Sequence, residues 1–246
     1  MLRLPKFELA TPATLSEAIA LLAEAGPGAQ IVAGGTDLVP NLKHELFTPD
    51  LVVSLQKIAE LTGLRVDASG WLHIGAMTTL ADVAASPLVR AHAPVLAQAA
   101  SLVAGPQLRT MGTLGGNVML DTRCQWYNQT HFWRQALGFC LKKDGSVCHV
   151  VAGGSKCVAA ASNDTAPALM TLGAELVFEG PNGRRVLPID DFWIADGTYN
   201  KKREHGEILA AVRVPPPGAG HRSAYGKLRD RGSIDFPLLG VAARLA

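Results

Sequence analysis

The four cysteines of this 246-residue chain all fall in one stretch, and this clustering constrains how the stretch can fold. They are Cys124, Cys140, Cys148 and Cys157, separated by fifteen, seven and eight residues. The spacing lacks both the C-x2-C pairs of a zinc ribbon and the compact run of a bacterial ferredoxin. Four thiolates satisfy a tetrahedral zinc ion or a [4Fe-4S] cluster, and two disulfides or four unrelated core thiols are further alternatives. The spacing alone leaves all of them open.

Two glycine pairs are candidates for binding an anion. Gly34-Gly35 follows the apolar run Ile31-Val32 as a loop would follow a strand, and Gly115-Gly116 is flanked by Thr113 and Asn117. Adjacent glycines leave the backbone bare, so their N–H groups can approach a phosphate closely. A single Gly-Gly pair is more typical of a tight turn. Two such pairs in one chain favour a phosphate-binding cradle.

Composition and charge exclude several classes of function. A net charge of +2 without basic blocks gives no electrostatic footprint for nucleic acid. Charge and proline interrupt the apolar runs well before the length of a membrane span. Nothing that resembles a signal peptide precedes the first predicted strand. We therefore expect a soluble cytoplasmic protein in a reducing compartment, where disulfides are rare.

Periodicity and capping signals predict alternating helices and strands. Thr14 and Glu17 form a capping box for a helix that ends at Gly26-Pro27. Strands are expected at residues 30–33, 51–55, 71–76, 174–178, 185–187 and 208–214, and helices at 80–85, 89–103 and 166–172. By its position, Asp164 is the expected N-cap of the last helix. Residues 113–117 are expected to form a loop, and the three prolines at 215–217 a linker.

The order and spacing of these features resemble a known family. Residues Ile31 to Leu38, Gly112 to Asn117, Asp164 and Lys227 resemble positions in the FAD-binding medium subunit of the molybdenum hydroxylases, the group that includes xanthine and carbon monoxide dehydrogenases. The resemblance covers nearly the whole chain. It implies an α+β, two-lobed FAD-binding fold of the PCMH type.

The same resemblance makes the cysteine-rich stretch look like an insertion. In that family Asn117 lies close to the position of Asp164, so about forty extra residues separate them here. An inserted four-cysteine block resembles the β subunits of the 4-hydroxybenzoyl-CoA reductases, a branch of the family that carries a [4Fe-4S] cluster there. The implied domains are an N-terminal FAD-binding lobe at residues 1–57, a second FAD-binding lobe at 58–217 with the insertion at about 121–161, and the start of a truncated C-terminal domain at 218–246.

The resemblance also implies which residues bind cofactors. The implied FAD-binding set is Ile31, Val32, Ala33, Gly34, Gly35, Thr36, Asp37, Leu38, Thr113, Gly115, Gly116, Asn117, Asp164, Leu209 and Lys227. The two glycine stretches would hold the pyrophosphate and Asp164 the ribityl or ribose hydroxyls, with Leu209 and Lys227 near the isoalloxazine. The implied ligands of a [4Fe-4S] cluster are Cys124, Cys140, Cys148 and Cys157. Taken without the family, Lys227 is equally typical of a solvated surface lysine.

Five aromatic residues and two histidines accompany the cysteines. The aromatic residues are Trp126, Tyr127, Phe132, Trp133 and Phe139. They would either exclude water from a cluster or only pack the insertion onto the domain. His131 and His149 are interpreted as surface or packing residues, because four sulfurs already complete a ligand set.

The resemblance implies an electron-transfer subunit without catalytic residues of its own. Electrons from reduced ferredoxin would enter the [4Fe-4S] cluster, pass to FAD and to [2Fe-2S] clusters on a small subunit, and reach molybdenum on a large subunit. That subunit would dehydroxylate 4-hydroxybenzoyl-CoA to benzoyl-CoA, within an expected dimer of heterotrimers. One alternative is the FAD subunit of a xanthine or carbon monoxide dehydrogenase type enzyme with structural zinc. Another is a non-enzymatic nucleotide-binding module.

Overall fold

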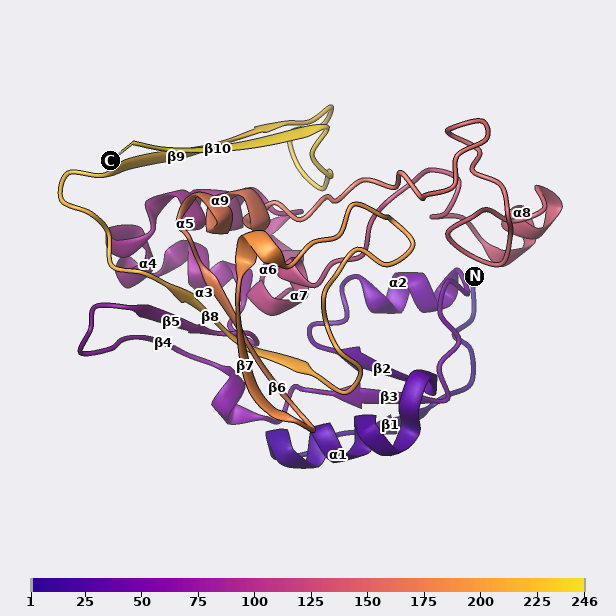
Figure 1. Ribbon diagram of the computed structural model, residues 1–246, viewed down its shortest axis with the longest axis horizontal. Coiled ribbons are helices and arrows are strands. Elements are labelled where there is room, and N and C mark those ends of the chain that lie inside the picture. Colours follow the sequence, from indigo (N-terminus) through magenta and orange to yellow (C-terminus); the bar gives the residue numbers. More distant parts are fainter. Residues whose placement is uncertain (1, 246) are drawn as a thin grey trace.

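The computed structural model describes residues 2–245, which form three β-sheets with helices packed around them (Figure 1). The strands are β1 (Glu8–Ala10), β2 (Ala29–Val32), β3 (Leu51–Ser54), β4 (Leu64–Val66), β5 (Leu72–Gly75), β6 (Glu175–Gly180), β7 (Gly183–Pro188), β8 (Ile208–Val214), β9 (Arg222–Leu228) and β10 (Leu239–Leu245). The helices are α1 (Leu15–Ala25), α2 (Leu38–Lys43), α3 (Leu80–Ala85), α4 (Pro87–His92), α5 (Pro94–Leu102), α6 (Pro106–Arg109), α7 (Leu114–Val118), α8 (His131–Ala136) and α9 (Thr165–Thr171). Short 3-10 turns are η1 (Gly26–Gly28), η2 (Ala59–Leu61) and η3 (Ile189–Asp191).

The first sheet is parallel, with strand order β1-β3-β2, and α1 packs against it. The predicted capping box starts α1: the Glu17 N–H donates to Thr14 Oγ1 at 3.2 Å, and the Thr14 N–H donates to the Glu17 carboxylate at 3.3 Å. Ala18 and Leu22 of α1 are buried in one core with Val53 of β3. Residues 33–37, the first glycine stretch, connect the carboxyl end of β2 to α2.

The second sheet is antiparallel, with strand order β4-β5-β8-β6-β7. Helices α3, α5 and α9 cover one of its faces (Figure 1). The core between them is apolar and fully buried; Phe178 of β6 stacks near Phe192 with ring centroids 5.7 Å apart. The strands predicted at residues 174–178 and 185–187 are confirmed, and as β6 and β7 they form a hairpin with its turn at Pro181 and Asn182.

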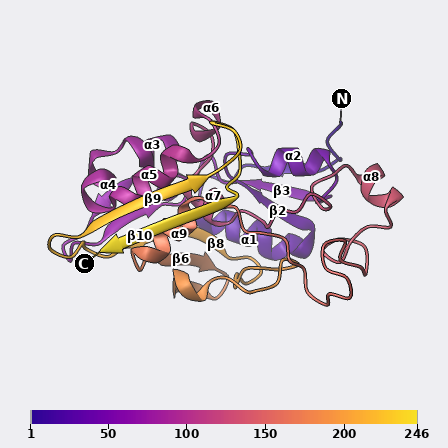
Figure 2. The same ribbon diagram turned by 90° about the horizontal axis from the view of Figure 1, so that it is seen from above.

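The third sheet is the β9–β10 hairpin, which follows the three prolines after β8. It lies over α5 and α9 on their side away from the second sheet (Figures 1 and 2). Tyr225 of β9 inserts into the core of the second lobe. Each of the three sheets is formed within one of the residue ranges 1–57, 58–217 and 218–246. The division of the chain into domains at residues 57 and 217 stays a prediction.

The cysteine-rich insertion leaves the second lobe after α7, reaches across to α2 and returns to α9 (Figure 1). Its main anchor is Arg134 of α8, which is 2% exposed. The Arg134 guanidinium donates to the carbonyl of Glu45 at 2.9 Å and to that of Gln129 at 3.3 Å. The guanidinium also donates to the carbonyl of His44, the C-cap of α2, at 3.4 Å, and so satisfies a carbonyl that the helix terminus leaves free.

Two predicted elements are wrong in detail. The helix expected at residues 89–103 is split into α4 and α5 at Ala93. Ala93 precedes Pro94 and takes a non-helical conformation (φ −142°, ψ 64°), because a proline ring clashes with a helical residue before it. The loop expected at 113–117 is the one-turn helix α7, capped by Thr113, whose Oγ1 accepts from the Gly116 N–H at 3.0 Å.

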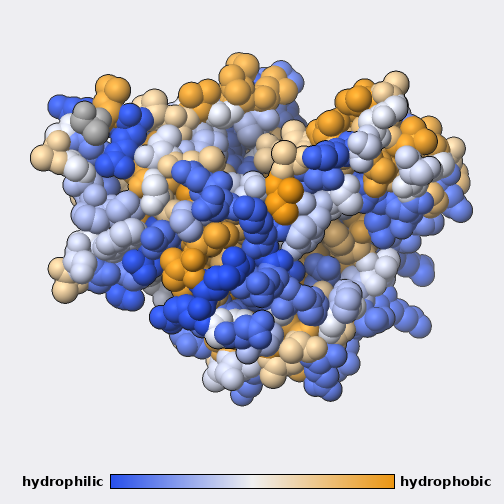
Figure 3. Space-filling view, viewed as in Figure 1, coloured by the Kyte–Doolittle hydropathy of each residue, from blue (hydrophilic) through white to orange (hydrophobic). Residues whose placement is uncertain are grey.

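The surface of the insertion carries several apolar side chains, visible as an orange region at the upper right of Figure 3. Phe132 is 80% exposed, and Val147 and Val150 are more than half exposed. Phe132 therefore cannot exclude water from the cysteines, contrary to one of the two interpretations of the aromatic residues.

Over residues 2–245, no helix combines the length and the apolar character that crossing a bilayer requires.

Arg134→Met should lower the free energy of unfolding by about 2–3 kcal/mol, because buried carbonyls of α2 and the insertion lose a charged donor. Urea or thermal unfolding measures this loss. Arg184→Met removes a guanidinium whose side chain is 71% exposed and should change stability by less than about 0.5 kcal/mol. Equal stability of the two variants would show that Arg134 does not anchor the insertion.

Candidate cofactor cavity and cysteine site

A cavity of about 740 Å³ lies where the two lobes meet. This volume is in the range of small-molecule and cofactor sites. The predicted FAD-binding residues that line it are Ile31, Ala33, Gly34, Gly35, Thr36, Asp37, Leu38, Thr113, Gly115, Gly116, Asn117, Asp164 and Leu209. Val32 and Lys227 of the predicted set are not among its lining residues.

Two glycines allow the loops around this cavity to meet backbone to backbone. A Cβ at Gly34 would overlap the carbonyl oxygen of Met111, and a Cβ at Gly115 would lie 2.6 Å from the Cβ of Ala76. A larger residue at Gly34 would force the lobes apart, and one at Gly115 would push α7 away from Ala76 within the second lobe. Gly116 is less closely surrounded. Within 4 Å, a Cβ there would meet only Thr113 Oγ1, at 3.0 Å, and the Ala33 Cβ, at 4.0 Å.

The free backbone donors of the cavity belong to the first glycine stretch. The N–H groups of Gly34, Gly35, Thr36 and Asp37 donate no hydrogen bond within residues 2–245. In α7, by contrast, the Gly115 N–H donates to the Ala76 carbonyl at 2.8 Å and the Gly116 N–H to Thr113. The first stretch is thus the better anion cradle, and α7 mainly provides shape.

Asn117, and not Asp164, caps helix α9. The Asn117 Oδ1 accepts from the Thr165 hydroxyl at 2.6 Å and from the Thr165 N–H at 3.1 Å. Asp164 occupies the N-cap position with helical dihedrals and makes no capping bond. The expected capping role of Asp164 is therefore wrong, because Asn117, which is 48 positions before Thr165 in the sequence, fills it.

The Asp164 carboxylate instead forms a buried network with the β9 strand. It accepts from the Tyr225 hydroxyl and from Lys227 Nζ, both at 2.8 Å. The Asp164 and Lys227 side chains are 3% and 1% exposed, so the interpretation of Lys227 as a solvated surface lysine is wrong. Burial raises the pKa of Asp164, and the two hydrogen bonds from Lys227 and Tyr225 oppose this shift. Asp164 lines the cavity, whereas Lys227 does not.

All four cysteines line one small second cavity, together with Trp126, Tyr127 and His149. All four are free thiols, which leaves the two-disulfide alternative without support. Burial raises the pKa of the Cys157 thiol, whereas backbone N–H groups led by that of Val151 lower the pKa of Cys148. The donor set fits a thiolate-bound metal in kind. As placed among residues 2–245, however, no three His, Cys, Asp or Glu side chains are grouped to hold a metal ion.

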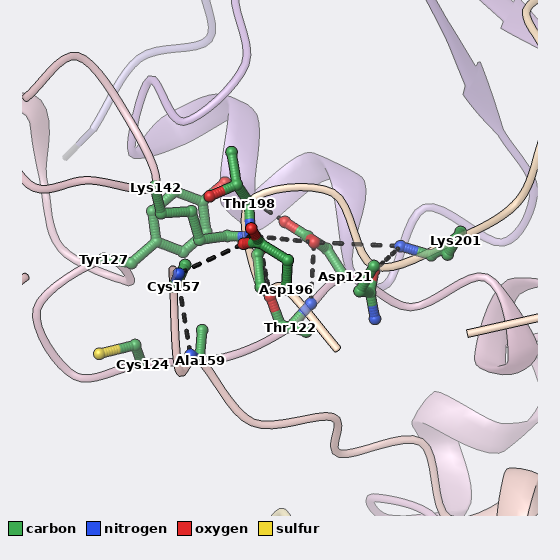
Figure 4. A network of polar contacts seen from close by, with 12 residues as sticks. Asp121, Thr122, Cys124, Tyr127, Lys142, Cys157, Ala159, Asp196, Thr198 and Lys201 are labelled. Atoms are coloured by element: carbon green, nitrogen blue, oxygen red, sulfur yellow. Dashed lines mark hydrogen bonds and ion pairs between the residues drawn. The ribbon is translucent and has the colours of Figure 1, made fainter. Parts of the chain in front are cut away.

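The charged residues between the two cavities were not predicted from the sequence. Lys201 and Asp121 line the large cavity, and Lys142 lines the cysteine cavity (Figure 4). Arg123, beside Cys124, forms an ion pair with Asp37 of the first glycine stretch. The basic run Lys201-Lys202-Arg203 just before β8 was the only sequence signal for this region.

Comparison with known proteins agrees with this geometry. Residues 5–217 match the family described as the FAD binding domain in molybdopterin dehydrogenase. The carbon monoxide dehydrogenase medium chain of Hydrogenophaga pseudoflava is 34% identical over 97% of this chain and 68% of its own length. The nicotinate dehydrogenase FAD-subunit of Eubacterium barkeri is 32% identical over 95% of this chain and 67% of its own length.

The fold comparison gives the same result. A structure of the Hydrogenophaga pseudoflava carbon monoxide dehydrogenase that lacks the Mo-pyranopterin moiety matches with a TM-score of 0.76 and 34% identity, over 98% of this chain and 69% of that chain. This chain thus spans about two thirds of the length of the relatives that it matches. The expected two-lobed α+β fold is confirmed. The chain belongs to the family of FAD-binding domains that form the medium subunits of the molybdopterin dehydrogenases, or molybdenum hydroxylases.

Proposed function

We propose that this chain is the flavin and iron-sulfur subunit of a complex of the 4-hydroxybenzoyl-CoA reductase type. In this role it would take electrons from reduced ferredoxin and deliver them to a molybdenum subunit, which would dehydroxylate 4-hydroxybenzoyl-CoA to benzoyl-CoA. The proposal depends chiefly on one observation: four free cysteines from a single insertion line one cavity.

We assign FAD to the large cavity. Support comes from the family, from the volume of the cavity and from the unused N–H groups of residues 34–37 at its edge. The pyrophosphate would bind to these amides, since backbone donors in a glycine stretch suit an anion. Asp164 would accept hydrogen bonds from sugar hydroxyls, and Leu209 would contact the flavin ring. Residues 1–57 and 58–217 would then be the two FAD-binding lobes, with 218–246 beginning a third unit.

We assign a [4Fe-4S] cluster to Cys124, Cys140, Cys148 and Cys157. Four thiolates match the four irons of such a cluster, which stores one electron at a potential set by its surroundings, while FAD exchanges one or two. All four thiols belong to one insertion and line one cavity.

The proposed partners are a large molybdenum subunit, a small subunit with [2Fe-2S] clusters and ferredoxin as electron donor. We expect the heterotrimer to be doubled by a two-fold axis, the commonest symmetry of such assemblies. The chain contributes no catalytic residue in this scheme, since substrate would bind on the molybdenum subunit.

A second candidate is the FAD subunit of another molybdenum hydroxylase, with structural zinc at the cysteines. The names of the relatives favour it, since they are carbon monoxide and nicotinate dehydrogenases. Zinc is redox-silent and colourless, so the two candidates differ in spectrum and in metal content.

Gly116→Val should weaken FAD binding at least tenfold with the fold retained, because Gly116 lines the cavity and a side chain there would occupy space assigned to FAD. Flavin absorbance per protein and a titration with FAD measure this. Gly226→Val is the matched control, since a Cβ there meets no atom within 4 Å and lies outside the cavity. Equal flavin content in the two variants would contradict the assignment of FAD to this cavity.

Cys140→Ser should remove or weaken the cluster, because serine oxygen is a poor ligand for an iron-sulfur core. FAD should stay bound, since both glycine stretches lie outside the insertion. Reduction by ferredoxin should slow sharply, whereas reduction of the flavin by a small artificial donor should persist. Ser155→Ala, an exposed position in the same insertion, is the control.

The zinc candidate predicts a different result for Cys140→Ser. If the cysteines bind structural zinc, the substitution should lower stability and leave the iron content and the visible spectrum unchanged. Unchanged iron, spectrum and ferredoxin reactivity together would end the proposal that electrons enter at the cysteines.

A further inference from the structure

A buried polar network joins the cysteine cavity to the large cavity (Figure 4). On the cysteine side, the Lys142 side chain is 4% exposed. Its Nζ lies 3.0 Å from Asp121 Oδ1 and 2.8 Å from Thr122 Oγ1, and it also donates to the carbonyl of Gly197. Lys142 therefore has a fixed position beside the thiols, unlike a lysine on a free surface.

Lys201 reaches the same carboxylate oxygen from the other side. Its side chain is 12% exposed, and its Nζ lies 3.9 Å from Asp121 Oδ1 and 2.8 Å from Asn200 Oδ1. Both Lys201 and Asp121 line the large cavity. One carboxylate thus links two buried ammonium groups, each of which faces a different cavity.

The charges in this network do not balance. Two ammonium groups share the one Asp121 carboxylate, and Arg203, which lines the same cavity, adds positive charge. The nearby Asp196 carboxylate accepts instead from the backbone N–H groups of Cys157 and Thr198 and pairs with neither lysine (Figure 4). Burial lowers the pKa of Lys201 to about 8, with Asp121 opposing the shift, so that Lys201 is still largely protonated at neutral pH. Excess buried charge is costly unless an opposite charge compensates it. The uncompensated charge therefore indicates that anions bind beside the network.

We propose that Lys142, Asp121 and Lys201 form a cationic bridge that stabilises negative charge in both cavities at once. On one side the charge is that of metal-bound thiolates, and on the other it is that of a flavin nucleotide. The proposal deepens the function proposed above and rests on it for the identity of the two anions. The three residues would act as positioning residues, since they tune two sites through their field without belonging to either ligand set.

The flavin side is tested in the purified complex by Lys201→Met, with Lys202→Met as control. Lys202 is the exposed neighbour of the same type, so the two variants remove the same charge from adjacent positions. The Kd for oxidised FAD and the midpoint potential of the bound flavin are measured for both. We expect Lys201→Met to weaken FAD binding tenfold or to shift the two-electron reduction equilibrium tenfold towards oxidised flavin, which is about 30 mV.

These two readouts separate the sources of the negative charge. Weaker binding of oxidised FAD places the phosphates near Lys201, whereas a lower potential places the flavin ring there. Lys201→Arg should restore either property, because it keeps the charge. Values for Lys201→Met equal to those for Lys202→Met, in both measurements, would overturn the proposal.

The cysteine side is tested by Lys142→Met, with Lys143→Met as control. After treatment of the full chain with a chelator, Co²⁺ is titrated in and followed by thiolate-to-cobalt absorption at one fixed pH. We expect about tenfold weaker Co²⁺ binding in Lys142→Met only, with four thiols still counted in both unfolded variants. Equal affinities would overturn the bridge, whatever the flavin does.

Asp121→Asn distinguishes an electrostatic effect from local damage. It adds one net positive charge to the network, so flavin affinity or potential should change in the direction opposite to Lys201→Met. A change in the same direction would mean that both substitutions only disturb the loop, and would overturn the proposal. A wild-type complex without flavin would instead overturn the proposed function, while the Co²⁺ titration would still test the bridge.

Discussion

Backbone contact between the two lobes is the constraint on which the large cavity depends. Gly34 of the first lobe lies directly against the carbonyl of Met111 in the second lobe, at a distance that no side chain would permit. Within the second lobe, Gly115 lies similarly close to Ala76. Because the Gly34 contact joins the first glycine stretch to the loop before α7, the two lobes present their loops to a single space. The unpaired N–H groups of residues 34–37 lie at its edge. Gly34 thus contributes both to the shape of the cavity and to its capacity for an anion, whereas Gly115 contributes to shape alone.

Buried charge distinguishes the two ends of this cavity. At one end Asp164 and Lys227 balance each other, and Tyr225 completes the set of hydrogen bonds. At the other end Asp121 is shared by two lysines, so positive charge is left over. A balanced pair serves mainly to hold α9 and β9 together, whereas an unbalanced one favours an incoming anion. The insertion with the cysteines begins at Asp121, in the unbalanced set, and ends shortly before Asp164, in the balanced one.

Local signals in the sequence predicted the local structure well. Thr14 and Glu17 gave the start of α1, and the apolar runs gave β3 and β8, because these features depend on residues a few positions apart. Pro94 should have predicted the break between α4 and α5. The family resemblance, more than any pattern, led to the residues around the large cavity, and thirteen of its fifteen line it.

Contacts between residues that are far apart in the sequence were not predicted. Asp164 satisfies every local rule for an N-cap, yet Lys227, which is 63 residues away, holds its carboxylate. Lys142 and Lys143 are indistinguishable in sequence, and only tertiary packing buries the first beside the thiols. The clustering of the four cysteines in the sequence indicated a shared metal site. It did not distinguish zinc from an iron-sulfur cluster, because both accept four thiolates.

The central claim is that these cysteines form a redox site next to a flavin cavity. It is tested most directly by iron, acid-labile sulfide and zinc per FAD in this chain purified by itself without oxygen, so that [2Fe-2S] clusters of a partner do not add to the count. A [4Fe-4S] cluster predicts about four iron and four sulfide per FAD, with little zinc. About one zinc per FAD without sulfide, or no metal at all, would contradict the account.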